Sequence, residues 1–184
     1  MDYRKTFTVT FTILGLFLLF SFAKGAFAQY VFESTAYKFS ITLPEGWTIE
    51  TYKPDFTVRA DNSNDYSSIT VKVEKTNFLH GIDITDIPLD TIRNQVERSY
   101  LNKYRNCDVM KASEGMLDGI PAYFIFVKYP DLVYDYPHIF IAFIYIAIYD
   151  QKFYSLIGTG TIEKYQEKEN LFNKIFSTFK FLKE

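Results

Sequence analysis

A histidine followed by two aspartates is the feature of this sequence closest to a metal-binding site. Residues 80–86 read His-Gly-Ile-Asp-Ile-Thr-Asp, so His80, Asp83 and Asp86 could offer one imidazole nitrogen and two carboxylate oxygens. Ligands of this kind bind divalent transition metals. The three side chains must converge in space to do so, and an ordinary solvated loop is the alternative interpretation.

A second candidate site is a tyrosine-rich stretch. We interpret Pro130 to His138 as an exposed loop, and with Tyr129 it combines three tyrosines, two aspartates and a histidine. Tyrosine gives contact area and a hydroxyl group at low entropic cost, which suits it to protein interfaces. Ordinary loop packing is the alternative. The residues predicted to bind a partner are Tyr129, Tyr134, Tyr136 and His138.

Motifs of other ligand sites and of catalysis are incomplete. Asp61, Ser63 and Asp65 have the opening spacing of a calcium-binding EF-hand loop. Tyrosine and lysine stand where that loop needs glycine and glutamate, so a solvated hairpin tip is the better interpretation. The chain has two histidines and no Gly-x-Ser-x-Gly elbow, and its one cysteine, Cys107, is expected to be a buried, unreactive thiol. No catalytic residue is assigned, and the only cofactor considered is a metal ion.

The first 28 residues have the layout of a secretory signal peptide. Two basic residues precede an apolar segment from Phe7 to Ala23, and Ala26-Phe27-Ala28 supplies the small residues of a cleavage site. The apolar segment is nearly long enough to span a bilayer, so an uncleaved anchor is the alternative. Because the basic end stays in the cytoplasm, both alternatives place a domain of residues 29–184 in an extracytoplasmic space, secreted or held at the cytoplasmic membrane.

Composition limits the classes of partner. The chain has 20 basic and 22 acidic side chains, a formal net charge of −2. Nucleic acid is not expected as a partner, because its phosphates require a basic surface. Membrane contact is expected only through the N-terminal segment, if that segment is not cleaved. A single cysteine allows no internal disulfide, so a core rich in phenylalanine and tyrosine must hold the domain together.

The element that organises the rest of the chain is an uncharged run from Ile139 to Tyr149. β-Branched and aromatic residues predominate in it, which predicts a strand buried on both faces. The break Asp150-Gln151 predicts a hairpin to a strand at Phe153 to Ile157, and Ala122 to Tyr129 forms another apolar strand. A sheet whose inner strands are apolar on both faces must be covered on both sides.

Two amphipathic helices are predicted to supply that cover. Apolar residues recur at three- and four-residue spacing from Leu89 to Tyr104. A second helix is expected from Ile162 to about Thr178, with Thr161 as its N-cap. The predicted fold class is α+β, with a single antiparallel β-sheet and α-helices packed on both faces in an α/β/α sandwich.

Three segments in sequence order carry the pattern of a known family. They are residues 37–47 (Tyr-Lys-Phe-Ser-Ile-Thr-Leu-Pro-Glu-Gly-Trp), residues 119–123 (Gly-Ile-Pro-Ala-Tyr), and Phe172 to Ile175 with Phe179-Lys-Phe181. Together they resemble the PsbP-like family, whose namesake is the extrinsic lumenal subunit of the photosystem II oxygen-evolving complex. The family includes exported bacterial and archaeal proteins of unassigned role. The resemblance implies a single antiparallel sheet with helices on both faces, and no enzyme chemistry.

Three hypotheses for function follow. The first is a non-enzymatic, extracytoplasmic accessory or binding module for an envelope protein or complex, which the resemblance and the tyrosine-rich stretch favour. The second is a small-ligand or metal carrier that uses a pocket between sheet and helix, which the residues around His80 favour for a metal. An enzyme of unknown class is the third.

Overall fold

A computed structural model describes residues 29–75, 80–104, 106–133 and 136–183 of the chain. The predicted signal segment of residues 1–28 lies outside these residues. Within the described ranges, no helix is long and apolar enough to cross a membrane.

The uncharged run forms the inner strand of a seven-stranded antiparallel sheet. This strand, β8 (Tyr136–Tyr149), pairs with β7 (Ile120–Val133) on one side and with β9 (Lys152–Thr161) on the other. Consecutive residues from Phe140 to Ile144 are buried, so both faces of β8 are covered. The prediction of an interior strand paired with both of these neighbours is therefore confirmed.

Tight turns join consecutive strands of the large sheet. Asp150 and Gln151 both have positive φ values, 47° and 59°, between β8 and β9. Asp118 and Gly119, with φ values of 48° and 78°, make the same kind of turn before β7. Positive φ at both central residues is the mark of the type I′ turn, whose twist matches that of paired strands. The predicted hairpin at Asp150 is confirmed.

The remaining strands extend the large sheet on both sides, in the order β3-β4-β5-β9-β8-β7-β6. In β4 and β5 apolar residues face one side and polar residues the other, as in Val58, Arg59 and Ala60. Such strands need cover on one face only. The bounds are β3 (Thr48–Lys53), β4 (Phe56–Asn62), β5 (Ser67–Lys75) and β6 (Asp108–Leu117).

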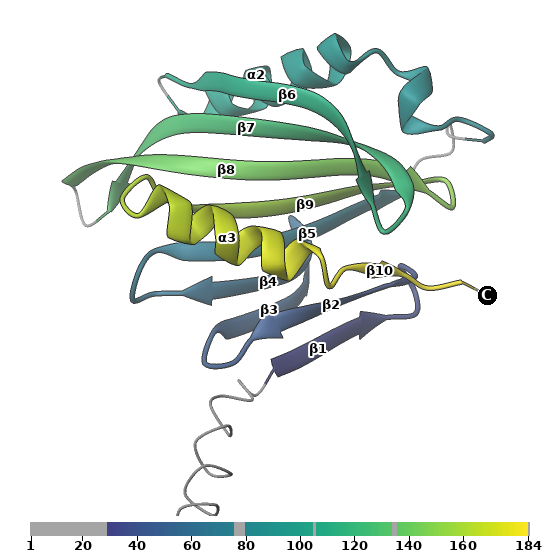
Figure 1. The fold of residues 1–184 in the computed structure, drawn as a ribbon, viewed down its shortest axis with the longest axis horizontal. Helices are drawn as coiled ribbons and strands as arrows, with labels where there is room; N and C mark the ends of the chain where they lie inside the picture. The colour runs from purple at the N-terminus through teal and green to yellow at the C-terminus, as the bar shows by residue number, and fades with distance from the viewer. Residues whose placement is uncertain (1–28, 76–79, 105, 134–135, 184) are drawn as a thin grey trace, which may run out of the picture.

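The prediction of a single sheet with helices on both faces is wrong. A second, three-stranded sheet places β2 (Phe39–Pro44) between β1 (Gln29–Ser34) and β10 (Lys180–Phe181), so the described chain is mostly β structure in two sheets. Its buried residues join one core cluster with residues of the large sheet and of the C-terminal helix. The small sheet and α3 therefore cover one face of the large sheet together, whereas the prediction assigned that cover to helices alone (Figure 1).

Two α-helices and one short 3₁₀ helix complete the described part of the chain. The helix α2 (Leu89–Lys103) matches its predicted range and contributes Ile92 to a second core cluster with β7 and β8. The helix α3 (Tyr165–Phe176) is shorter than predicted. Thr161 ends β9 and does not cap α3, whose N-cap is Lys164 in the left-handed conformation. The 3₁₀ helix η1 (Ile84–Asp86) precedes α2.

Candidate functional site

Two of the three residues predicted to hold a metal, Asp83 and Asp86, are hydrogen-bonded within a local turn. The Asp83 carboxylate accepts a hydrogen bond from the backbone amide of Thr85 at 3.1 Å, and Asp86 accepts one from the amide of Asp83 at 2.8 Å. These bonds form a capping box at η1. His80 is exposed. Across the described ranges no group of three or more His, Cys, Asp or Glu side chains could hold a metal ion.

The tyrosine-rich stretch is a strand hairpin, so its interpretation as a loop is wrong. The register of β7 with β8 continues from Tyr129 opposite Phe140 to Val133 opposite Tyr136. Tyr129 is only 5% exposed and stacks on Phe140. Tyr136 is 72% exposed, whereas His138 is half-buried. Tyr134 lies outside the described residues.

Exposed apolar side chains gather at the end of this hairpin. Leu132 and Tyr136 are 64% and 72% exposed, on β7 and β8. The amide of Ile162 donates a hydrogen bond to the carbonyl oxygen of Ile139 at 2.8 Å, which brings the chain after β9 to the same place. The ring of Tyr66, in the β4–β5 turn, lies 6.4 Å from that of His138. We call this the hairpin-end surface: Tyr66, Leu132, Tyr136, Ile139 and Ile162.

A groove lies between α2 and the face of the large sheet that carries Arg59, Ile157 and Thr159. It has a volume of about 690 Å³, and a second cavity of about 410 Å³ shares Ser99, Tyr100 and Ile157 with it and continues along the helix. We call the larger cavity the α2 groove. The helix side supplies Ser99, Tyr100, Lys103 and Tyr104, and the sheet side supplies Arg59, Asp61, Ser68, Tyr129, Ile157 and Thr159 among others.

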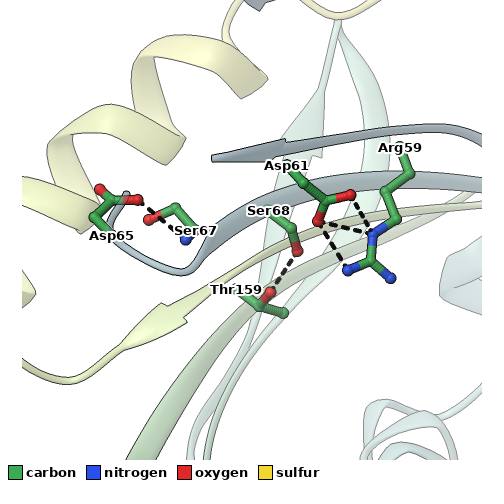
Figure 2. A network of polar contacts seen from close by, with 6 residues as sticks. All are labelled: Arg59, Asp61, Asp65, Ser67, Ser68 and Thr159. Atoms are coloured by element: carbon green, nitrogen blue, oxygen red, sulfur yellow. Dashed lines mark hydrogen bonds and ion pairs between the residues drawn. The ribbon is translucent and has the colours of Figure 1, made fainter. Parts of the chain in front are cut away.

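Paired polar side chains form the sheet side of the α2 groove (Figure 2). Arg59 Nε donates to both carboxylate oxygens of Asp61 at 2.9 Å, and its Nη2 donates to one of them at 2.8 Å. This bond and the nearby carboxylate raise the pKa of the Arg59 guanidinium, so Arg59 stays cationic beside the acidic side chain of Asp61. The Ser68 and Thr159 hydroxyl oxygens lie 2.6 Å apart, across the strands β5 and β9.

Three tyrosine rings meet on another wall of the groove, Tyr100 and Tyr104 from the helix side and Tyr129 from β7. The Tyr129 ring centroid lies 4.4 Å from that of Tyr104 and 5.0 Å from that of Tyr100. Burial raises the pKa of the Tyr100 and Tyr129 phenols well above the ordinary value. Both rings are therefore neutral at any physiological pH. Burial likewise raises the pKa of the Cys107 thiol, consistent with the expected unreactive cysteine.

A buried lysine joins α3 to the β4–β5 turn. Lys168 is 4% exposed, and its ammonium group donates to the carbonyl oxygen of Asp65 at 2.9 Å and to Ser67 Oγ at 2.8 Å. Asp65 also accepts a hydrogen bond from the Ser67 amide. The two aspartates with EF-hand spacing, Asp61 and Asp65, are thus both engaged by protein groups.

Sequence reasoning missed the α2 groove because its residues are distant in the sequence. Arg59, Ser68 and Thr159 come together only through the strand order β4-β5-β9. The available signal was the alternation of Val58, Arg59 and Ala60, which marks Arg59 and Asp61 as neighbours on one polar face.

A family model and two solved structures resemble this chain. The family model described as PsbP matches residues 26–181. The solution structure of cyanobacterial PsbP (CyanoP) from Synechocystis sp. PCC 6803 superimposes with a TM-score of 0.64 at 14% identity, covering 86% of this chain and 95% of that one. The Saccharomyces cerevisiae Ran-binding protein Mog1p gives 0.54 at 11% identity, covering 85% and 97%. No curated protein sequence matches significantly. The chain belongs to the PsbP family.

Proposed function

We propose that this chain is a non-catalytic, extracytoplasmic binding module that docks to a protein of the cell envelope through the hairpin-end surface. The observation that carries the proposal is the exposure of five large apolar side chains at one end of the large sheet. Single exposed apolar residues are ordinary on a soluble protein. A group of them at one place is the usual mark of an interaction site.

The hairpin-end surface has the composition and the support of a protein-binding surface. Tyr66 and Tyr136 provide aromatic anchors, which dominate the binding energy of many interfaces. Backbone pairing of Leu132 with Pro137 and of Val133 with Tyr136 keeps the described ends of β7 and β8 side by side. A surface that is already ordered loses less entropy on binding than a flexible loop does.

Two further observations support a non-catalytic role outside the cytoplasm. The Cys107 thiol is buried. The two histidines lie on separate segments, His80 before η1 and His138 in β8, and the described ranges contain no metal-binding group. The predicted signal segment directs residues 29–184 across the membrane. A protein of similar fold, Mog1p, is itself named for binding another protein, Ran.

Site-specific photocrosslinking in intact cells tests this proposal. A photoreactive phenylalanine analogue at Leu132 is expected to give one discrete adduct in the envelope fraction. The matched control is the same analogue at Met116, which is 59% exposed near the β6–β7 turn, at the other end of β7. An adduct at Leu132 that is absent at Met116, and that Tyr136→Ser weakens, supports the proposal. Equal labelling at both positions, or none at Leu132, contradicts it.

A further inference from the structure

The α2 groove has the size and shape of a small-ligand site. Its volume of about 690 Å³ falls within the roughly 300–1,000 Å³ typical of ligand pockets. The second cavity, of about 410 Å³, continues it along α2 past Ser99 and Tyr100. An elongated ligand made of linked units therefore suits it better than one compact molecule.

Hydroxyl groups predominate in the lining of the α2 groove. Nine of its seventeen lining residues are serine, threonine or tyrosine. A hydroxyl group both donates and accepts hydrogen bonds, so such a lining can satisfy ligand groups that do the same. The Ser68 and Thr159 pair, with oxygens 2.6 Å apart, presents two such groups side by side on the sheet.

The charged groups of the α2 groove are arranged for a neutral ligand. Arg59 donates its Nε hydrogen and one Nη2 hydrogen to Asp61. The other guanidinium hydrogens can donate to a ligand beside the carboxylate. A fixed donor next to a fixed acceptor matches two adjacent hydroxyl groups of a ligand. Asp55 and Asp131 also line the groove and oppose Lys103, so the lining has no excess positive charge to attract an anion.

The tyrosine wall offers the half-buried ring of Tyr104, which its neighbours hold in place. Tyr104 packs on Tyr129, and the ammonium group of Lys103 lies 5.0 Å from the Tyr104 ring centroid. A tyrosine ring presents an apolar face and a polar edge with little conformational freedom to lose. The weakly polar C–H face of a sugar ring packs well on such a surface. A wholly apolar ligand would instead leave the Arg59 and Asp61 groups desolvated and unpaired.

We propose that the α2 groove binds a neutral polyhydroxylated ligand, an oligosaccharide, with its hydroxyl groups on Arg59, Asp61, Ser68 and Thr159 and its ring faces on Tyr104. This site borders the hairpin-end surface, since Tyr66 belongs to both, but none of the residues proposed to contact the ligand belongs to that surface. It also gives a ligand class to the pocket between sheet and helix that the small-ligand hypothesis requires.

The experiment is a titration of the full-length chain, expressed with its own N-terminal segment, followed by amide NMR spectroscopy. The neutral probes are maltotriose, cellotriose, mannotriose and chitotriose, and trigalacturonate is the anionic probe. At least one neutral trisaccharide is expected to give saturable shifts at Ser68, Thr159 and Ser99 to Tyr104. Saturable binding of trigalacturonate alone, or shifts elsewhere only, overturns the proposal.

Variants separate specific contacts from a general effect on the fold. Arg59→Gln and Thr159→Val are each expected to weaken binding of that trisaccharide about tenfold, because each removes hydrogen bonds to the ligand. Lys111→Gln, an exposed change on β6, is the control and should leave affinity unchanged. If the NMR spectrum of Arg59→Gln shows that this variant does not fold, the test rests on the trisaccharide affinity of Thr159→Val and on the shifts in the wild type. Unchanged affinity in Thr159→Val contradicts the assignment.

A sedimentation experiment distinguishes free sugars from glycans attached to the cell envelope. Insoluble envelope polysaccharide of the expression host is mixed with the chain and sedimented. If the chain sediments with the polysaccharide and the trisaccharide releases it, the natural ligand is an attached glycan. If the trisaccharide binds saturably but the chain does not sediment, the natural ligand is a soluble sugar. Sedimentation that no trisaccharide reverses, and that Arg59→Gln leaves unchanged, contradicts a role for the α2 groove.

Discussion

The carboxylate of Asp118 accepts a hydrogen bond at 2.9 Å from the backbone amide of Phe181, 63 residues further along the chain. Its other oxygen accepts one from Lys180 Nζ at 2.7 Å. Asp118 belongs to the β6–β7 turn of the large sheet, and Phe181 belongs to β10 of the small one. One side chain in a tight turn thus fastens the two sheets together.

Replacing Asp118 by asparagine is expected to lower the free energy of unfolding at pH 7 by about 1–2 kcal/mol, since a charge-assisted pair of bonds is weakened. Asparagine tolerates the left-handed backbone of this turn, so the turn itself should survive. Urea denaturation measures the change. Lys180→Ala is the control, and it should cost less than about 1 kcal/mol because Lys180 is mostly exposed.

The same aspartate predicts a dependence of stability on pH. Burial raises the pKa of the Asp118 carboxyl, but the bonds from Lys180 and Phe181 outweigh burial and lower the pKa below its ordinary value of 3.8. Its stabilisation is therefore complete above about pH 5 and is lost as the pH falls through the folded-state pKa. Urea denaturation from pH 7 to pH 2 should show a smaller loss for Asp118→Asn than for the wild type. Parallel curves for the two proteins would contradict this.

Gly158→Ala is expected to destabilise the domain by about 1–3 kcal/mol through overpacking. A Cβ atom at Gly158 would lie 2.7 Å from Cγ of Phe172, a fully buried ring of α3. The matched control is Gly115→Ala on β6, whose new Cβ would meet no atom closer than 3.9 Å. Thermal unfolding of both variants makes the comparison. Similar losses of stability in the two variants would show that the Phe172 ring of α3 does not pack closely against Gly158 of β9.

Tyr154→Phe is expected to cost about 1–2 kcal/mol, because it leaves the carbonyl oxygen of Tyr37 without its partner. The Tyr154 hydroxyl donates to that oxygen at 2.6 Å from a fully buried position on β9. Tyr30→Phe removes a hydroxyl from a ring that is 46% exposed, and it should change stability by less than about 0.5 kcal/mol. Chemical denaturation of the two variants is the measurement, and an equal effect would contradict the assigned bond.

The N-terminal segment predicts a processing event. In the wild type, cleavage after Ala28 should yield a chain that begins at Gln29, and Ala28→Arg should block cleavage because the site needs a small residue there. Intact mass measurement of the exported protein distinguishes the two. A wild-type chain that retains Met1 in the membrane fraction would indicate the anchor, and a soluble cytoplasmic chain with Met1 would contradict both.

The sequence predicted elements whose signals are local. The uncharged run around Ile144 identified β8, the dipeptide Asp150-Gln151 identified its turn, and helical spacing after Leu89 identified α2. The second sheet had no comparable signal. The alternation of Phe39, Ile41 and Leu43 indicates that one face is buried, and the same pattern serves a strand of either sheet.

The hairpin end and the α2 groove were missed for different physical reasons. Proline and aspartate disfavour strands, so Pro130, Asp131 and Pro137 indicated a loop, although the backbone of a hairpin end pairs around them. The groove depends on strand order, which brings Arg59 and Thr159 onto one surface from distant parts of the chain. Residue types predict neither arrangement without the pairing.

The small sheet unites the first and last described strands, since β1 and β10 both pair with β2. Thr178 Oγ1 accepts a hydrogen bond from the Thr42 amide across 136 positions, so these contacts close very long loops. Contacts that close such long loops form more slowly than local ones. The two sheets therefore cannot both be complete until the segment from Thr178 to Phe181 has reached β2, however early the hairpins of the large sheet have formed.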